Sequence, residues 1–231
     1  MATIVPAVLA SSQEQFDTEL SLFLSIPQVS RIQIDVVDGI FASPATWPDN
    51  TREKSADRAI STMLPALERV AYEIDLMGFN PIALAEQWVK RGATRLTFHY
   101  ETSTRPEEML REAREHFGSI ISIGLALNIQ TDLELVADLE EHIDYLQCMG
   151  IAHIGRQGEP FDRQSLTKVR LARLRYPRLP VQVDGGVSFA TGRELIAAGA
   201  SSLIGGSAIL RASDPAAEYA RLESIESPYG V

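Results

Sequence analysis

Hydrophobic residues alternate with polar ones in the stretch Ile32-Gln33-Ile34-Asp35-Val36-Val37-Asp38-Gly39, which predicts a short buried strand that ends in a turn. Because alternate side chains of a strand share a face, Ile32, Ile34 and Val36 point one way, whereas Gln33, Asp35 and Val37 point the other. A polar face between buried β-branched residues costs free energy unless those groups have partners or a function. The stretch is therefore a candidate functional strand.

Two further stretches repeat this pattern. Glu73, Asp75 and Met77 share one face of the strand predicted over 71–77, and Gln182 and Asp184 share one face of the strand predicted over 180–184. If these strands line one barrel, then the carboxylates of Asp35, Asp75 and Asp184 meet at its mouth.

Apolar, β-rich runs alternate with helical patterns along the whole chain. The predicted strands cover 3–9, 31–37, 71–77, 94–99, 120–127, 143–149, 180–184 and 202–205. A helix is predicted to open at Ser11, where Glu14 completes a capping box, and the other predicted helices cover 53–63, 81–91, 106–117, 132–141, 163–176, 191–198 and 215–225. Eight strand–helix units predict an α/β fold, the (β/α)8 TIM barrel, with an open doubly wound sheet as the alternative.

Length and composition indicate the number of domains and exclude some classes of partner. The chain has 231 residues and no Pro/Gly/Ser-rich linker, so we expect one domain over 1–231. Its formal net charge of −10 argues against a nucleic-acid or anionic-membrane partner, and no apolar run is long enough to span a bilayer. Without a signal-peptide pattern, the cytoplasm is the expected location. A homo-oligomer is compatible with the sequence.

Several stretches resemble the ribulose-phosphate 3-epimerase family, whose fold is a ribulose-phosphate-binding TIM barrel. They are 4–9, 32–41, 74–77, 125–128, 183–187, 198–200 and 205–209, and they follow the family's order along the chain. The resemblance implies that Asp35 and Asp184 are the paired catalytic acid and base. It also implies that Ala7, Met77, His99 and Met149 lie near the substrate.

Some positions depart from the family. The family places metal-ligating histidines where this chain has Gln33 and Asp75, and a serine where it has Ala7. The loop after the sixth strand is also different and contains His153 and Arg156, which could add charge to a phosphate site, cover the substrate or be plain solvated residues. These departures concern the metal ligands and the substrate loop, whereas the stretches that carry the fold are kept.

A metal site remains compatible with this altered set of residues. Gln33, Asp35, Asp75 and Asp184 would offer only oxygen ligands, which favours Mg²⁺, Mn²⁺ or Ca²⁺ over Zn²⁺. The alternative is a metal-free site in which the carboxylates share a proton or have Arg95 nearby. The predicted face of Arg95 also allows it to pair with Glu73 lower in the barrel. The cofactor prediction is thus a divalent metal (Mg, Mn or Zn) or none.

Small residues end the last two predicted strands. Gly185, Gly186, Gly206 and Ser207 supply backbone N–H groups where barrels often bind phosphate, although tight packing also explains glycines there. The three lysines all lie on predicted helices or helix starts, which disfavours a Schiff-base aldolase.

These residues support two hypotheses of function. The first is an epimerase or isomerase of a phosphorylated ketose, which needs one base to remove a proton and one acid to return it on the opposite face. The second is a protein of the same fold that binds a sugar phosphate without turnover. In both, the partner is a small sugar phosphate.

Overall fold

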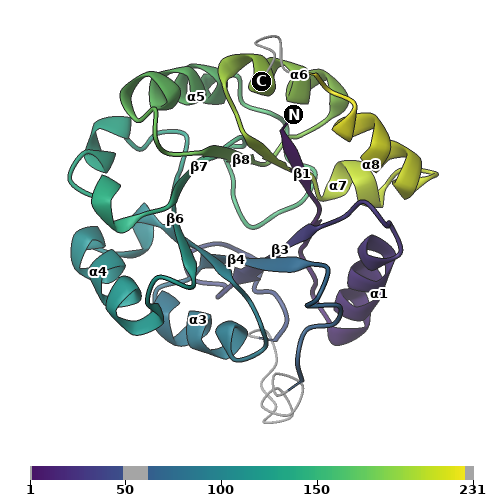
Figure 1. Cartoon of the computed structure of the whole chain (residues 1–231), viewed down its shortest axis with the longest axis horizontal. Helices are drawn as coiled ribbons and strands as arrows, with labels where there is room; N and C mark the ends of the chain where they lie inside the picture. Colours follow the sequence, from purple (N-terminus) through teal and green to yellow (C-terminus); the bar gives the residue numbers. More distant parts are fainter. Residues whose placement is uncertain (1, 49–61, 227–231) are drawn as a thin grey trace.

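The computed structural model describes residues 2–48 and 62–226, and within these ranges the strands form one ring surrounded by helices (Figure 1). The strands are β1 (Thr3–Val5), β2 (Ala7–Val8), β3 (Arg31–Val37), β4 (Ala71–Met77), β5 (Arg95–His99), β6 (Ser122–Leu127), β7 (Tyr145–Met149), β8 (Val181–Asp184) and β9 (Ser202–Ile204). The helices are α1 (Gln13–Leu24), α3 (Pro81–Val89), α4 (Pro106–Phe117), α5 (Gln164–Arg175), α6 (Phe189–Ala198), α7 (Ser207–Leu210) and α8 (Pro215–Glu223). Three 3₁₀ turns add η1 (Tyr100–Thr102), η2 (Leu133–Val136) and η3 (Glu140–His142).

All the strand pairs are parallel, in the order β1-β9-β8-β7-β6-β5-β4-β3-β2. β1 and β2 are the two halves of one predicted strand, separated by Pro6, which has no N–H to donate. The first half pairs with β9 and the second half with β3, so this split strand closes the ring. The predicted (β/α)8 TIM barrel is confirmed.

The alternation along β3 sorts its side chains as predicted. Ile32, Ile34 and Val36 are buried in the main hydrophobic core with side chains of the helices, such as Phe16 of α1. Gln33 reaches across the lumen to Asp184 of β8. Because β3 and β4 pair in register from Arg31 to Val37, Asp35 lies beside Asp75 at the carboxyl ends of their strands.

The segment predicted as a helix over 132–141 is different in the structure, because it forms the two 3₁₀ turns η2 and η3. Its buried residues are Leu133, Val136 and Leu139, three positions apart. Within η2, the spacing of Leu133 and Val136 matches the three residues per turn of a 3₁₀ helix, which places both apolar side chains on one side.

Other differences are local. The N-cap of α1 is Ser12, whose hydroxyl accepts from the Gln15 N–H, and Ser11 lies one residue outside the cap. The short helix α7 was not predicted from the sequence. The helix predicted over 53–63 falls almost wholly outside the described residues. Within the described ranges, no helix is both long and apolar enough to cross a bilayer.

Candidate active site

A buried ion cluster forms the lower layer of the barrel lumen. Glu73 of β4 is fully buried and accepts from Arg95 Nε at 2.8 Å and from the Thr97 hydroxyl at 3.1 Å. Arg31 of β3 approaches the same carboxylate at 3.8 Å. The predicted pairing of Arg95 with Glu73 is confirmed, so Arg95 does not serve the carboxylates at the barrel mouth.

Two buried glutamines connect this layer to the one above it. Gln182 of β8 donates through Nε2 to Glu73 and, at 2.8 Å, to Oε1 of Gln147. Gln147 of β7 donates at 3.1 Å to one carboxylate oxygen of Asp75. The other oxygen of Asp75 lies 2.9 Å from Nε2 of His99, which is also fully buried. Asp75 is therefore held from two sides.

Gln147 was not singled out from the sequence. It occupies the position between Tyr145 and Met149 that alternation assigns to the lumen, but a single amide on an apolar strand carries little signal by itself. Its part in the site follows only from its distance to Asp75.

The upper layer holds the two predicted catalytic carboxylates. Nε2 of Gln33 donates to Asp35 at 2.7 Å and to Asp184 at 2.8 Å, so one amide group bridges carboxylates from opposite sides of the barrel. Asp35 is buried and Asp184 is half-buried. This bridge fixes both carboxylates toward the same small space.

Oxygen atoms of Asp35, Asp75 and Asp184 lie within 4.8 Å of one another. Burial and the charge of Asp75 raise the pKa of Asp184 to about 8. Burial and the charges of Asp184 and Asp75 raise the pKa of Asp35 well above its usual range. Burial lowers the pKa of His99, but the charge and hydrogen bond of Asp75, together with the charges of Glu101 and Asp184, outweigh it, so the net shift of this pKa is upward. The cluster thus favours either a retained proton or a bound cation.

The donor chemistry fits a hard divalent cation. Oε1 of Gln33 is buried and has no hydrogen-bond partner, and a half-turn of the amide would bring this carbonyl oxygen toward the carboxylates. Three carboxylates and one carbonyl then offer only oxygen atoms, which suit Mg²⁺ or Mn²⁺ better than Zn²⁺.

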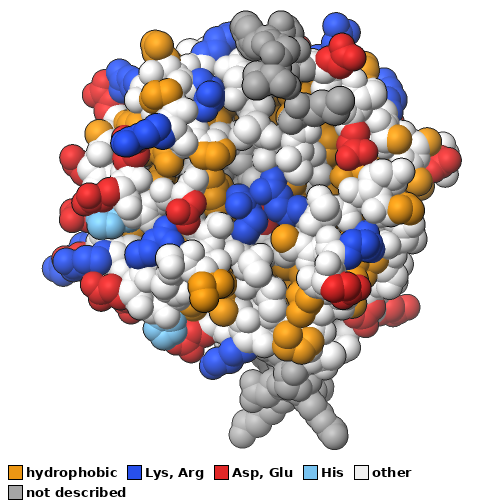
Figure 2. Space-filling view, in the orientation of Figure 1, with side chains coloured by type: hydrophobic (Ala, Val, Ile, Leu, Met, Phe, Trp, Pro, Cys, Tyr) orange, Lys and Arg blue, Asp and Glu red, His pale blue; other side chains and the backbone are white. Residues whose placement is uncertain are grey.

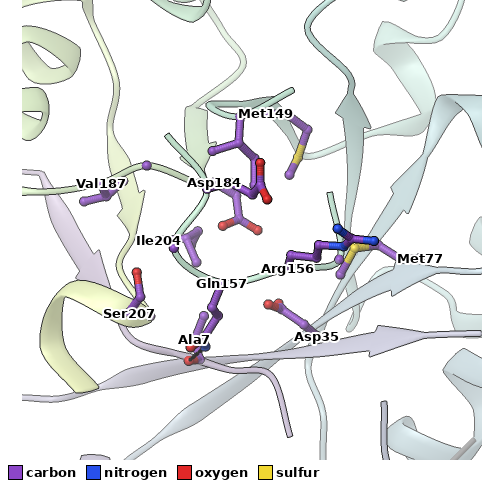
Figure 3. Close-up of a pocket in the computed structure, with 17 residues that line it drawn as sticks. Ala7, Asp35, Met77, Met149, Arg156, Gln157, Asp184, Val187, Ile204 and Ser207 are labelled. Atoms are coloured by element: carbon purple, nitrogen blue, oxygen red, sulfur yellow. Dashed lines mark hydrogen bonds between the residues drawn. The ribbon is translucent and has the colours of Figure 1, made fainter. Parts of the chain in front are cut away.

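A cavity of about 50 Å³ opens above these carboxylates (Figure 3). Apart from Asp35 and Asp184, the structure brings seven of the residues predicted for substrate or phosphate into its wall. They are Ala7, Met77, Met149, Gly185, Gly186, Gly206 and Ser207. The predicted residue His99 does not reach this wall and instead contacts Asp75 below it.

The loop after β7 crosses the mouth of the barrel. Nε of Arg156 donates to the carbonyl oxygen of Ser43 at 3.0 Å, and the Gln157 amide donates to the carbonyl oxygen of Ala7 at 3.4 Å. His153 is exposed and lies 3.3 Å from Glu159, and it is not part of the cavity wall. Of the two charged residues considered in this loop, only Arg156 enters the site.

Asp38 has a structural role in the turn that follows β3. Its carboxylate accepts from the N–H groups of Ile40 and Phe41, both at 2.7 Å, and from the N–H of Phe79 at 3.0 Å. It stabilises the turn after β3 and lies outside the cavity wall.

Comparisons with known proteins agree with this architecture. A model of the ribulose-phosphate 3-epimerase family matches residues 3–210. Ribulose-phosphate 3-epimerase of Schizosaccharomyces pombe is 29% identical over 214 residues, which cover 93% of this chain and 89% of the relative. The cytoplasmic isoform of Oryza sativa is 26% identical over 216 residues, covering 93% and 90%. Among solved structures, 3-hexulose-6-phosphate synthase from Salmonella typhimurium has a TM-score of 0.68 at 18% identity, covering 97% of this chain and 98% of its own.

Proposed function

Because the chain belongs to the ribulose-phosphate 3-epimerase family, we propose that it epimerises a phosphorylated ketose by proton transfer between Asp35 and Asp184. The observation that carries the proposal is the pair of carboxylates facing one cavity from opposite sides of the barrel. One carboxylate removes the proton next to the carbonyl, and the other returns a proton to the opposite face of the same carbon.

The electrostatics of the cluster suit this exchange. One group must start ionised and the other protonated, and like charges in one partly desolvated site disfavour ionisation of both carboxylates at once. The raised pKa of Asp184, about 8, keeps a proton available near neutral pH. Gln33 acts as a positioning residue, because its amide holds both carboxylates in hydrogen-bond contact.

The phosphate group of the substrate would bind at the carboxyl ends of β8 and β9. Gly185 and Gly186 have φ angles of 100° and 67°, which side chains with a Cβ rarely adopt. A Cβ on Gly206 would lie 3.0 Å from the carbonyl oxygen of Ala7, so this turn is tightly packed against β2. Together with Ser207, these positions leave backbone N–H groups accessible to an anion.

When bound, a divalent cation would supply positive charge that stabilises the enediolate formed between the two proton transfers. Asp35, Asp75 and Asp184, together with the carbonyl oxygen of Gln33, would hold it. His99 and Gln147 would orient Asp75 from below.

A second candidate function is binding of a sugar phosphate without turnover. It is favoured by one observation: the amide nitrogen of Gln33 stands between the carboxylates where the family has an imidazole ligand. Both proposals place a small sugar phosphate in the same cavity. For either function, we propose that the protein acts in the cytoplasm.

Exchange of the substrate α-proton with solvent deuterium separates the two proposals. We expect exchange with a pentulose or hexulose phosphate in the wild type and none in Asp35→Asn or Asp184→Asn, because each face needs its own acid or base. Asp138→Asn is the control, since Asp138 is an exposed carboxylate that does not line the cavity. Binding without exchange in the wild type would favour the second function, and neither binding nor exchange would refute both.

A further inference from the structure

Arg156 is the only cationic side chain among the described residues that line the cavity. The other charged side chains in this wall are the carboxylates of Asp35, Asp184 and Glu159. A phosphorylated ketose brings more negative charge, and its enediolate adds a further one. The position of this single cation therefore bears directly on the reaction.

Arg156 lies on the side of the cavity away from the phosphate turns. In Figure 3, Ser207 and Val187 lie on one side of Asp184, whereas Arg156 lies on the other side, next to Met77 and near Asp35. Figure 2 shows Lys and Arg side chains at the centre of the ring, where the loop after β7 crosses the barrel in Figure 1. A ligand with its phosphate at Ser207 would direct its other end toward Arg156.

The guanidinium is held by one edge, so its other donors are available. Nε donates to the carbonyl oxygen of Ser43, and the Nη groups form no hydrogen bond or ion pair with any described residue. A guanidinium presents its N–H groups as a planar fork that binds two adjacent oxygens at once. The carbonyl oxygen and neighbouring hydroxyl of a ketose become such a pair in a cis-enediolate.

We propose that the Arg156 guanidinium binds the carbonyl oxygen of the ketose and the neighbouring hydroxyl oxygen, on the side of the cavity away from the phosphate turns, and stabilises the enediolate that forms between them. In the step concerned, a carboxylate takes the proton from the carbon next to the carbonyl. The electron pair of the broken C–H bond moves into the C–C bond, and the carbonyl π pair moves onto the carbonyl oxygen. Arg156 stabilises the negative charge on this oxygen and keeps its own proton. The inference rests on the proposed function.

Binding equilibria test this assignment without requiring turnover. The probes are inorganic phosphate, a phosphorylated hydroxamate that mimics the enediolate, and a phosphorylated polyol that has no carbonyl, each titrated by calorimetry. Arg156→Gln should weaken hydroxamate binding by about tenfold to a hundredfold, as expected for a lost charge-assisted hydrogen-bond pair. It should change the binding of phosphate and of the polyol by less than about threefold.

Two further measurements separate a charge effect from loop tethering. If Arg156 only fastened the loop to Ser43, then Arg156→Lys and Arg156→Gln would weaken all three probes alike, and added guanidinium ion would restore nothing. If it binds the enediolate, then Arg156→Lys keeps part of the hydroxamate affinity, and guanidinium ion partly restores deuterium exchange in Arg156→Gln. Arg170→Gln on α5, outside the cavity wall, is the matched control.

The outcomes distinguish this inference from the proposed function. Equal hydroxamate affinity in Arg156→Gln and wild type, with exchange present in the wild type, would overturn the role of Arg156 and leave the epimerase proposal standing. A wild type that binds none of the probes and catalyses no exchange would instead overturn the proposed function, and the role of Arg156 with it.

Discussion

Replacing Asp184 with asparagine should stabilise the fold at alkaline pH while it abolishes proton exchange. Asparagine keeps an oxygen that can accept from Gln33, as Asp184 does at 2.8 Å, but it carries no charge. In the wild type, the pKa of Asp184 is raised to about 8, whereas the unfolded chain loses this proton near the ordinary value of 3.8. Between these values the folded protein binds more protons than the unfolded chain, so its free energy of unfolding falls as the pH rises.

The size of the effect follows from that shift. At about 1.36 kcal/mol per pKa unit, the full displacement corresponds to an upper bound of roughly 6 kcal/mol. Asp184 is half-buried and Asp35 can hold the shared proton instead, so we expect a gain of about 2 kcal/mol in Asp184→Asn at pH 9. For a chain of this length, that gain raises the melting temperature by roughly 4–8 °C.

Thermal unfolding followed by circular dichroism in the presence of a chelator measures this gain at pH 5, 7 and 9. The advantage of Asp184→Asn should be largest at pH 9, smaller at pH 7 and smallest at pH 5, because the wild type loses stability progressively as the pH rises from the ordinary carboxyl pKa of 3.8 to the raised pKa of about 8. Asp138→Asn, an exposed carboxyl outside the cluster, should follow the wild type at every pH. If the melting temperature of Asp184→Asn at pH 9 were equal to or lower than that of the wild type, then ionisation of Asp184 would not destabilise the folded protein and the reasoning would be refuted.

Three further predictions concern the cation, the phosphate turn and the lower layer of the lumen. Added Mg²⁺ or Mn²⁺ should raise the melting temperature of the wild type more at pH 8 than at pH 6, because protons compete for the carboxylates; a response equal at both pH values would contradict this. Gly206→Asp should abolish calorimetric binding of a sugar phosphate with the far-ultraviolet circular dichroism unchanged, since it places bulk and negative charge where the anion binds. Glu73→Gln should lower the free energy of unfolding measured in urea by about 3 kcal/mol, because it leaves the half-buried Arg31 and Arg95 without their buried counter-charge, and a loss below about 1 kcal/mol would show that water already screens them.

The sequence was sufficient for the barrel because the pattern that predicts it is local. The predicted bounds 31–37 and 71–77 equal those of β3 and β4, since buried apolar residues alternate there with lumen residues. The helix predicted over 132–141 was wrong because apolar residues spaced by three and by four are hard to separate in a short segment. Periodicity alone does not distinguish a 3₁₀ turn from an α-helical one there.

The sequence predicted the site residues that lie at the carboxyl ends of strands. It did not predict the contacts that cross the barrel. Asp35, Asp75 and Asp184 could be grouped because parallel strands bring their carboxyl ends to one rim. The amide bridge of Gln33 depends on the width of the lumen between β3 and β8, which no pattern along the chain specifies. The entry of Arg156 into the cavity depends in the same way on a loop conformation fixed by distant contacts with Ser43 and Ala7.

The two hydrogen bonds that hold Asp75 also limit which side chain this position can carry. An imidazole at position 75 has at most one acceptor nitrogen, so it could not accept from both His99 and Gln147, as the carboxylate does. A change from carboxylate to imidazole here therefore requires a compensating change on β5 or β7, because a buried donor left without a partner costs free energy.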